Sequence, residues 1–397
     1  MAVDITFSLA FSLAFYNRNL RSYGSSAVPW YVWCSIASVT FAMTGIHWDI
    51  SWHRSIGRDS FWTPAHIMIH LCGVLAGVSC AYLILSTTFR QDSPLRKCSV
   101  GMWGFRGPLG AFIGAWGGIA MITSAPFDNW WHDAYGLDVK ILSPPHIVLA
   151  LGIFAVHLGA LILIVGQMNR AEGAVRTRLL AAFLYVRGMM LVCLMVMLME
   201  EATRTEMHSA HFYWLIALVT PALLAGTAQA TQFRWSATIV AGIYMAFLML
   251  MNWILPLFPA EPKLGPVFYS VKQFIPPEFP FLLIVPAFAM DLIWQRTSDW
   301  GAMKQSAVSG LAFVAVFAAV QWPFANFLMS PGARNWFFGT HYFGYYVHPN
   351  STWRQYRFGP TEQGAALWIG CAKALLTAVV MSWFGLRAGK WMQGIRR

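Results

Sequence analysis

Residues 144–168 read PPHIVLALGIFAVHLGALILIVGQM. This stretch contains no Asp, Glu, Lys or Arg, and it exceeds the roughly 20 apolar residues that cross the hydrocarbon core of a bilayer. Proline is favoured at the first position of a helix, so the paired prolines predict that a helix begins there. The stretch therefore predicts a transmembrane helix.

Similar apolar runs recur along the 397-residue chain, of which 57% is hydrophobic and 11% charged. Soluble proteins have about 25% charged residues, so most of this chain must face lipid or other helices. The predicted fold class is all-α, a polytopic helical bundle in the lipid bilayer. Its ten predicted transmembrane helices lie near 29–47, 64–89, 108–125, 144–168, 179–200, 211–230, 236–257, 279–296, 305–329 and 363–386.

The loops between these runs predict the orientation of the chain. One set of loops holds 16 Lys and Arg residues, and the opposite set holds nine. Basic residues favour the cytoplasmic side, so both termini are predicted to be cytoplasmic, in a bacterial-type inner membrane. The net charge of +11 is explained by these basic loop residues, so no nucleic-acid partner is expected.

The chain divides into three regions. Residues 1–28 are expected to form a cytoplasmic or interfacial segment, and residues 29–178 contain an internal repeat with units 29–106 and 107–178. WDISWH at 48–53 recurs as FDNWWH at 127–132, and TPAH at 63–66 recurs as SPPH at 143–146. Because the units have the same orientation, both motifs should lie on the periplasmic side. Residues 179–397 are predicted to form six helices with an aromatic outer loop, 331–362.

The repeated motif predicts metal binding. Its Asp and first His are four residues apart, so they share one face of a helix, and the second His follows a proline that begins the next helix. Two imidazoles and one carboxylate bind copper, zinc or non-haem iron and leave a coordination position open. The alternative is that the motif residues are helix caps and interfacial polar groups. The predicted ligands are Asp49, His53 and His66 in the first copy, and Asp128, His132 and His146 in the second.

Residues 49–66, DISWHRSIGRDSFWTPAH, resemble the signature of the C subunit of the copper membrane monooxygenases. That family oxidises methane, ammonia and short hydrocarbons. Its pattern is an Asp, a His four residues on, an Arg-Asp pair, and Thr-Pro-x-His thirteen residues after the first His. The resemblance implies that Asp49, His53 and His66 are copper ligands.

The chain departs from that family in several ways. The family's C subunit has fewer helices and one copy of the motif, and the Asn-x-x-x-His pair that supplies a neighbouring copper site in that family is not found in this chain. The second copy here is looser, with Leu137 where the first has Arg58 and one extra residue before His146. The family also works with a subunit that carries soluble cupredoxin domains, which this chain lacks. The partners implied are a cupredoxin-bearing or other membrane subunit, or a second copy of this chain.

Other polar residues are weaker candidates for the site. Asp59 and Asp138 are expected to orient the ligand imidazoles, with an ion pair from Arg58 to Asp59 as the alternative. His70 and His157 share helix faces with His66 and His146, and they suit haem ligation or proton transfer, with a satisfied packing residue as the alternative for each. An acidic loop would supply further ligands if it folded over the repeats; its candidates are Glu200, Glu201, Glu206, His208 and His211. Asp291 and Lys373 are expected to pair inside the membrane.

The leading functional prediction is a copper-dependent membrane monooxygenase acting on a small hydrophobic substrate with dioxygen. The metal alternatives are iron and zinc. The first rival function is non-catalytic metal acquisition or delivery. The second is a haem- or quinol-binding membrane subunit of a redox complex. No catalytic residue is assigned, and the aromatic segment 334–357 is expected to lie in the interface, cover the site or dock a partner.

Overall fold

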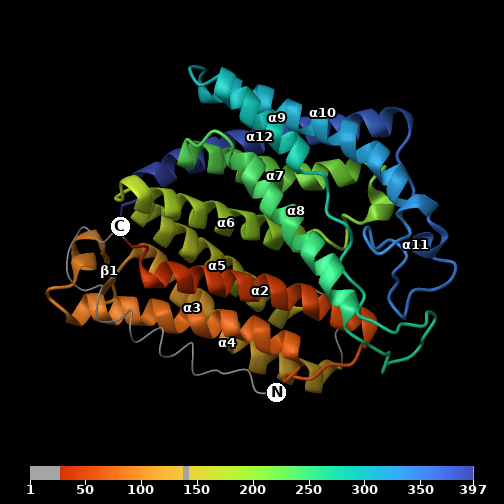
Figure 1. The fold of residues 1–397 in the computed structure, drawn as a ribbon, viewed down its shortest axis with the longest axis horizontal. Coiled ribbons are helices and arrows are strands. Elements are labelled where there is room, and N and C mark those ends of the chain that lie inside the picture. Colours follow the sequence, from red (N-terminus) through yellow and green to blue (C-terminus); the bar gives the residue numbers. More distant parts are fainter. Residues whose placement is uncertain (1–26, 137–142, 397) are drawn as a thin grey trace.

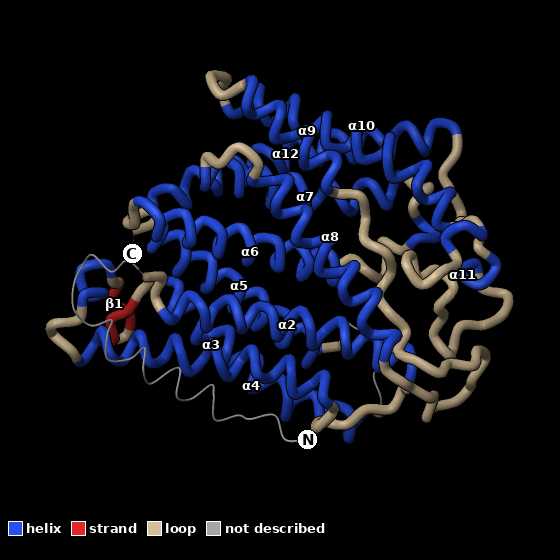
Figure 2. Tube along the Cα trace, in the orientation of Figure 1, coloured by secondary structure: helices blue, strands red, loops and turns tan. Residues whose placement is uncertain are grey.

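The structure is a computed structural model that describes residues 27–136 and 143–396. It is a helical bundle (Figure 1), and Figure 2 shows how little of the described chain is strand. The predicted segment 1–28 lies almost wholly outside the described residues. The α-helices are α2 (Trp30–Ser55), α3 (Pro64–Phe89), α4 (Leu109–Tyr135), α5 (Pro144–Met168), α6 (Gly173–Met197), α7 (Ala210–Thr231), α8 (Ser236–Ile254), α9 (Ile284–Arg296), α10 (Ala302–Leu328), α11 (Thr352–Gln355) and α12 (Gly364–Gly394).

Short elements lie between the long helices. An antiparallel hairpin pairs Val100 with Gly107 and Met102 with Phe105, at the end of α2 and α3 opposite to the loop that joins them (Figure 1). Its strands are β1 (Val100–Met102) and β2 (Phe105–Gly107). The 3₁₀ turns are η1 (Pro94–Cys98), η2 (Arg204–Glu206), η3 (Leu255–Leu257) and η4 (Pro331–Ala333).

Eight of the described helices are long and apolar enough to cross a membrane, which confirms a helical membrane bundle. Helix α2 has 26 residues but is more polar than these eight. The predicted span 279–296 is wrong in extent, because α9 contains only 13 residues, Ile284–Arg296. At 1.5 Å per residue this helix is about 20 Å long, short of the roughly 30 Å hydrocarbon core.

Helices α2 and α4 both continue beyond their predicted ends, at 47 and 125. Each is followed by a glycine in the left-handed region, Gly57 with φ 84° and Gly136 with φ 86°, a conformation that glycine adopts without steric cost. The helices that follow begin at Pro64 and Pro144, as expected from the prolines. The two extensions place each motif's Asp and first His on a helix.

Helices α3, α4 and α5 approach each other closely through glycines. A Cβ atom on Gly118 would lie 2.7 Å from the carbonyl oxygen of Gly73 and 2.9 Å from Gly77 Cα. On the other side of α4, a Cβ on Gly117 would lie 2.7 Å from the Gly152 carbonyl oxygen. Membrane helices associate closely where small residues meet. Helix α4 is therefore held between α3 and α5 with little room for side chains.

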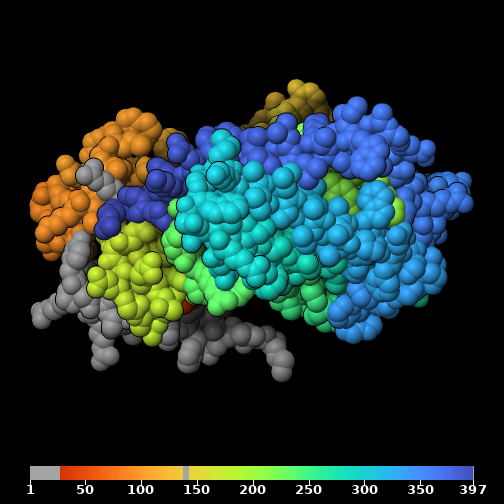
Figure 3. Space-filling view, turned by 90° about the horizontal axis from the view of Figure 1, so that it is seen from above, coloured from red at the N-terminus to blue at the C-terminus, as the bar shows by residue number. Residues whose placement is uncertain are grey.

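The C-terminal helices form the other side of the bundle, and α9, α10 and residues 331–362 cover much of the centre and right of the face seen in Figure 3. Helix α7 packs along α12, where a Cβ on Gly385 would meet the Ala222 carbonyl oxygen. Two outer loops, 258–283 and 331–363, lie at the end of the bundle where α2 ends (Figure 1). Both loops make direct hydrogen bonds with α2.

The predicted pairing of Asp291 with Lys373 is wrong. The Asp291 carboxylate accepts hydrogen bonds from the backbone N–H of Ala237, and from the N–H and hydroxyl of Thr238. Lys373 Nζ instead lies 3.5 Å from the centroid of the Trp214 ring. The first N–H groups of a helix have no intrahelical acceptor, so a carboxylate from α9 satisfies those at the start of α8.

Replacing Asp291 by Ala is expected to lower the free energy of unfolding by about 1–2 kcal/mol, as for other lost helix caps. Asp291→Asn keeps one acceptor oxygen, so it should lower the free energy of unfolding by less than Asp291→Ala does. Thermal unfolding in detergent measures both changes, with exposed Asp299→Ala as the control. Equal melting temperatures for Asp291→Ala and the control would contradict this role.

Candidate metal centre

Asp49 and His53 lie on the last two turns of α2, and two further donors come from residues that follow it. Asp59 is in the loop after α2, and His66 is in the first turn of α3. One nitrogen or oxygen atom from each of these four residues lies within 4.8 Å of all the others. We call this group the first cluster.

The distances between the donors suit a metal site. His66 Nε2 lies 3.1 Å from Asp49 Oδ1 and 3.3 Å from Asp59 Oδ2. His53 Nε2 lies 3.4 Å from Asp59 Oδ2 and 3.8 Å from Asp49 Oδ2. Charge-assisted hydrogen bonds are shorter, at about 2.7–2.9 Å. Ligands about 2.1 Å from a tetrahedral metal are about 3.4 Å apart, which is close to the spacing observed.

The loop after α2 sets the orientation of His66. Thr63 precedes α3, and its hydroxyl accepts a hydrogen bond from the N–H of Ser60. The Ser60 carbonyl lies 3.0 Å from His66 Nδ1, so Nδ1 carries the proton and donates it. The other ring nitrogen, Nε2, faces the first cluster. Such a hydrogen bond on the far nitrogen is what usually fixes a metal-binding histidine.

The structure brings Asp59 into the first cluster as a fourth donor, and the Arg58 side chain is exposed. Burial alone would raise the pKa of the Asp59 carboxyl. The hydrogen bond from His53 and the charges of His53 and His66 outweigh burial, and they hold the pKa below its ordinary value. Asp59 is therefore a carboxylate at neutral pH, the form that binds cations.

The second copy of the motif lies at the end of α4 and the start of α5, and its Asp lies near both histidines, but its three donors are not grouped within 4.8 Å of one another as those of the first cluster are. Asp128 Oδ1 lies 3.4 Å from His132 Nε2 and 3.5 Å from His146 Nε2. These three side chains are 25–34% exposed, so solvent reaches them. We call them the second trio. Asp138, the predicted counterpart of Asp59, lies outside the described residues.

The second trio and all members of the first cluster except His53 line one cavity of about 170 Å³. A cavity volume of about 10–15 Å³ on this measure holds one water, so the cavity has room for a small molecule. His70 also lines it, one turn below His66, with its ring stacked 5.5 Å from that of Phe61. The two motifs therefore meet at one end of the bundle. The apolar part of the wall comes from Phe61, Ile69, Ala125, Pro145 and Leu149.

Two buried carboxylate oxygens suit a cation. Asp49 Oδ1 and Asp128 Oδ1 are buried, and the polar atoms that face them among the described residues are imidazole nitrogens. A buried polar atom without a partner is costly, so most such atoms are satisfied by protein, water or an ion. Each of these oxygens faces an imidazole Nε2 at the distances given above. The residues present therefore fit a bound metal ion.

The acidic loop between α6 and α7 does not reach this cavity. Glu200, Glu201 and His211 are exposed. His208 is stacked on Trp322 at 4.4 Å, and its Nε2 hydrogen-bonds the Trp322 carbonyl. The cavity is lined by residues of α2 to α5 and the loops between them, so none of the candidates from this loop, Glu206 included, adds a ligand.

His157 lies three turns below His146, as predicted, but it is fully buried and does not line the cavity. Its Nδ1 donates to the Ile153 carbonyl, one turn back in α5. His47 on α2, which the motif analysis did not select, is also buried and bonds to the carbonyl of Met43. The bond to Ile153 satisfies only Nδ1 of His157, because its buried Nε2 has no hydrogen-bond partner among the described residues.

No protein-family model matches the chain, and neither the curated proteins nor the solved structures include a match. The functional argument therefore depends on the geometry of the cavity and its donors.

Proposed function

We propose that the chain is an integral membrane protein that binds copper in the first cluster and oxidises a small hydrophobic substrate with dioxygen. The observation that carries this proposal is the meeting of two imidazoles and two carboxylates at the edge of a cavity with an apolar wall. In this reading Asp49, His53, Asp59 and His66 hold the ion. The second trio holds a second ion across the same cavity.

The donor chemistry supports a transition metal. Imidazole nitrogen suits copper, zinc and iron, and carboxylate oxygen completes the donor set in both the first cluster and the second trio. Copper is preferred because residues 49–66 resemble the C-subunit signature of the copper membrane monooxygenases. When bound, copper supplies the one-electron chemistry that reaction with dioxygen requires. The residues of the chain would bind the ion at the edge of the cavity, and they line the cavity with apolar surface.

The topology proposed with this function has ten helices in the membrane. Helix α2 is about 39 Å long at 1.5 Å per residue, and α9 packs against α8 and α10. We also propose that 29–106 and 107–178 are duplicated units, which the parallel construction of the two motifs supports. The distribution of Lys and Arg favours a periplasmic cavity and cytoplasmic termini.

The first experiment is metal analysis of the detergent-purified protein beside the variants His53→Ala and His132→Ala. Copper near stoichiometric amounts in the wild type, lowered in each variant, is the expected result. Oxygen-dependent oxidation of a short hydrocarbon by membranes containing the protein then tests catalysis. Absence of any transition metal from the wild type would contradict the proposal.

Two other outcomes favour the rival functions. Copper that exchanges readily with a chelator, without any oxidation of hydrocarbon in the presence of a reductant, favours metal acquisition or delivery. Sharp bands in the reduced-minus-oxidised spectrum favour a haem-binding subunit of a redox complex, because an Asp/His copper site does not give them.

A further inference from the structure

Helix α2 carries two buried serines opposite its metal donors. Ser51 and Ser55 follow Asp49 and His53 by two residues each, which is about 200° around a helix. The serines are 1% and 0% exposed. One face of the last two turns therefore points to the first cluster, and the other points into the protein.

These serines form a closed set of hydrogen bonds with the outer loop 258–283. Ser51 Oγ donates to the Ile275 carbonyl at 2.6 Å, and the Ile275 N–H donates to Ser55 Oγ at 2.7 Å. Ser55 Oγ in turn donates to the Ser51 carbonyl at 2.6 Å. Both polar backbone groups of Ile275 are thus satisfied by α2. The loop is fixed to the helix by side chains 220 and 224 residues away in sequence.

Neighbouring bonds hold the same end of α2. Arg54 Nη1 donates to the Pro276 carbonyl at 3.2 Å, and the Arg54 carbonyl accepts from the N–H of Tyr345 at 3.1 Å. The N–H of Lys263 donates to the Ile56 carbonyl at 2.8 Å. Carbonyls at the end of a helix have no intrahelical donor, so both outer loops supply what the last turn of α2 lacks.

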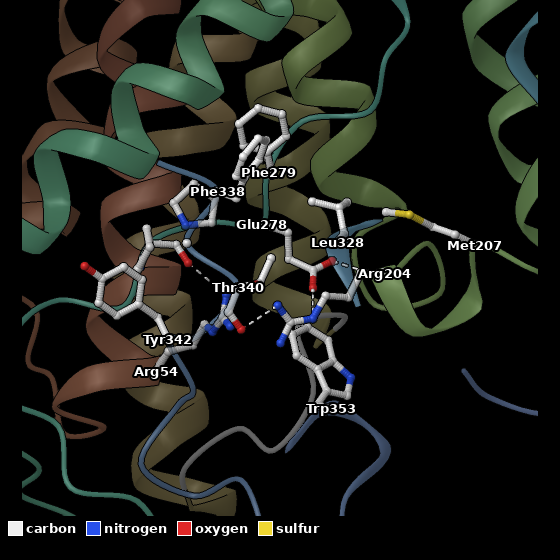
Figure 4. A pocket seen from close by; sticks show the side chains of 13 residues that line it. Arg54, Arg204, Met207, Glu278, Phe279, Leu328, Phe338, Thr340, Tyr342 and Trp353 are labelled. Atoms are coloured by element: carbon white, nitrogen blue, oxygen red, sulfur yellow. Dashed lines mark hydrogen bonds and ion pairs between the residues drawn. The ribbon is translucent and has the colours of Figure 1, made fainter. Parts of the chain in front are cut away.

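The far side of the loop is anchored by a buried ion pair. Arg204 Nε lies 3.5 Å from Glu278 Oε1, and the Arg204 N–H donates to Glu278 Oε2 at 2.9 Å. Arg204 also donates to the Thr340 carbonyl and lies over the Trp353 ring (Figure 4). The cavity beside this pair is about 10 Å³, room for about one water. Its size favours an anchor rather than a ligand site.

We propose that Ser51 and Ser55 are positioning residues for the first cluster; this rests on the proposed metal binding. Through Ile275 they fix the rotation and tilt of the last two turns of α2. Asp49 and His53 are thereby held at a constant distance from Asp59 and His66, which belong to the next loop and helix. The donors on α2 depend on a loop that never enters the cavity.

The test compares metal affinity in Ser51→Ala and Ser55→Ala with the wild type, all purified in detergent. Cu²⁺ titration gives the dissociation constant, and the visible spectrum with Co²⁺ as the probe reports coordination geometry. Loss of groups that support metal ligands typically weakens affinity about 10–100-fold. We expect at least about tenfold weaker Cu²⁺ binding and an altered Co²⁺ spectrum, with recovery in Ser51→Thr, which keeps the hydroxyl.

Ser35→Ala is the matched control. Ser35 is buried on the same helix, and its hydroxyl donates to the carbonyl of Tyr31 one turn back, within α2 itself. The proposal is overturned if the two serine variants bind like the wild type, or if Ser35→Ala weakens binding equally. If the wild-type protein binds neither Cu²⁺ nor Co²⁺, that result would contradict the proposed function and therefore this inference as well.

Discussion

The double variant His53→Ala/His66→Ala is expected to bind Cu²⁺ at least about a hundredfold more weakly than the wild type at the first cluster. Removing a group that only supports a ligand lowers metal affinity about 10–100-fold. Removing two direct ligands should therefore lower the affinity by more than this. Two carboxylates remain, and Asp49 and Asp59 alone are a poor match for copper. Competition with a chelator of known affinity measures the change.

The corresponding variant of the second trio is His132→Ala/His146→Ala. If the two groups hold separate ions, each double variant loses one ion and keeps the other. Because both groups line one cavity, the remaining site should bind its ion more tightly, since two nearby cations repel each other. The control is His211→Ala/His348→Ala, two exposed histidines that do not line the cavity. Unchanged copper content in both double variants would exclude the cavity as a metal centre.

Gly118→Ala is expected to lower the free energy of unfolding by about 1–3 kcal/mol, the usual cost of overpacking. The added methyl group would lie 2.7 Å from the carbonyl oxygen of Gly73 and 2.9 Å from the backbone nitrogen of Gly77. These are backbone atoms, so the clash cannot be relieved by a side-chain rotation. Helices α3 and α4 would have to separate, and these helices carry His66 and the first two residues of the second trio.

Gly77→Ala is the matched control at the same interface. Its Cβ would lie 4.0 Å from Gly118 Cα, an ordinary van der Waals contact, and alanine favours a helix over glycine by about 1 kcal/mol. Thermal unfolding in detergent should therefore separate the two variants, with Gly118→Ala lower and Gly77→Ala near the wild type. Equal melting temperatures would mean that α3 and α4 are not as close as described.

The sequence alone was enough to predict most helices and the two motifs. Membrane spans are set by runs of apolar residues and by prolines, which are local properties, so α3, α5 and α10 lie close to their predicted positions. The four-residue spacing of Asp49 and His53 likewise set their common face. The span 279–296 was predicted too long, because that apolar run includes a non-helical segment before α9 begins at Ile284.

Only the tertiary structure decided which of these residues meet. Asp59 joins the first cluster as a donor because the loop between Gly57 and Thr63 turns it toward His53 and His66. The acidic loop after α6 stays away, and Asp291 caps α8 rather than pairing with Lys373. The shared cavity and the bonds from Ser51 and Ser55 to Ile275 join segments far apart in the chain. Periodicity and spacing describe neighbours along one helix, whereas these contacts join different helices and loops and depend on how those elements pack against one another.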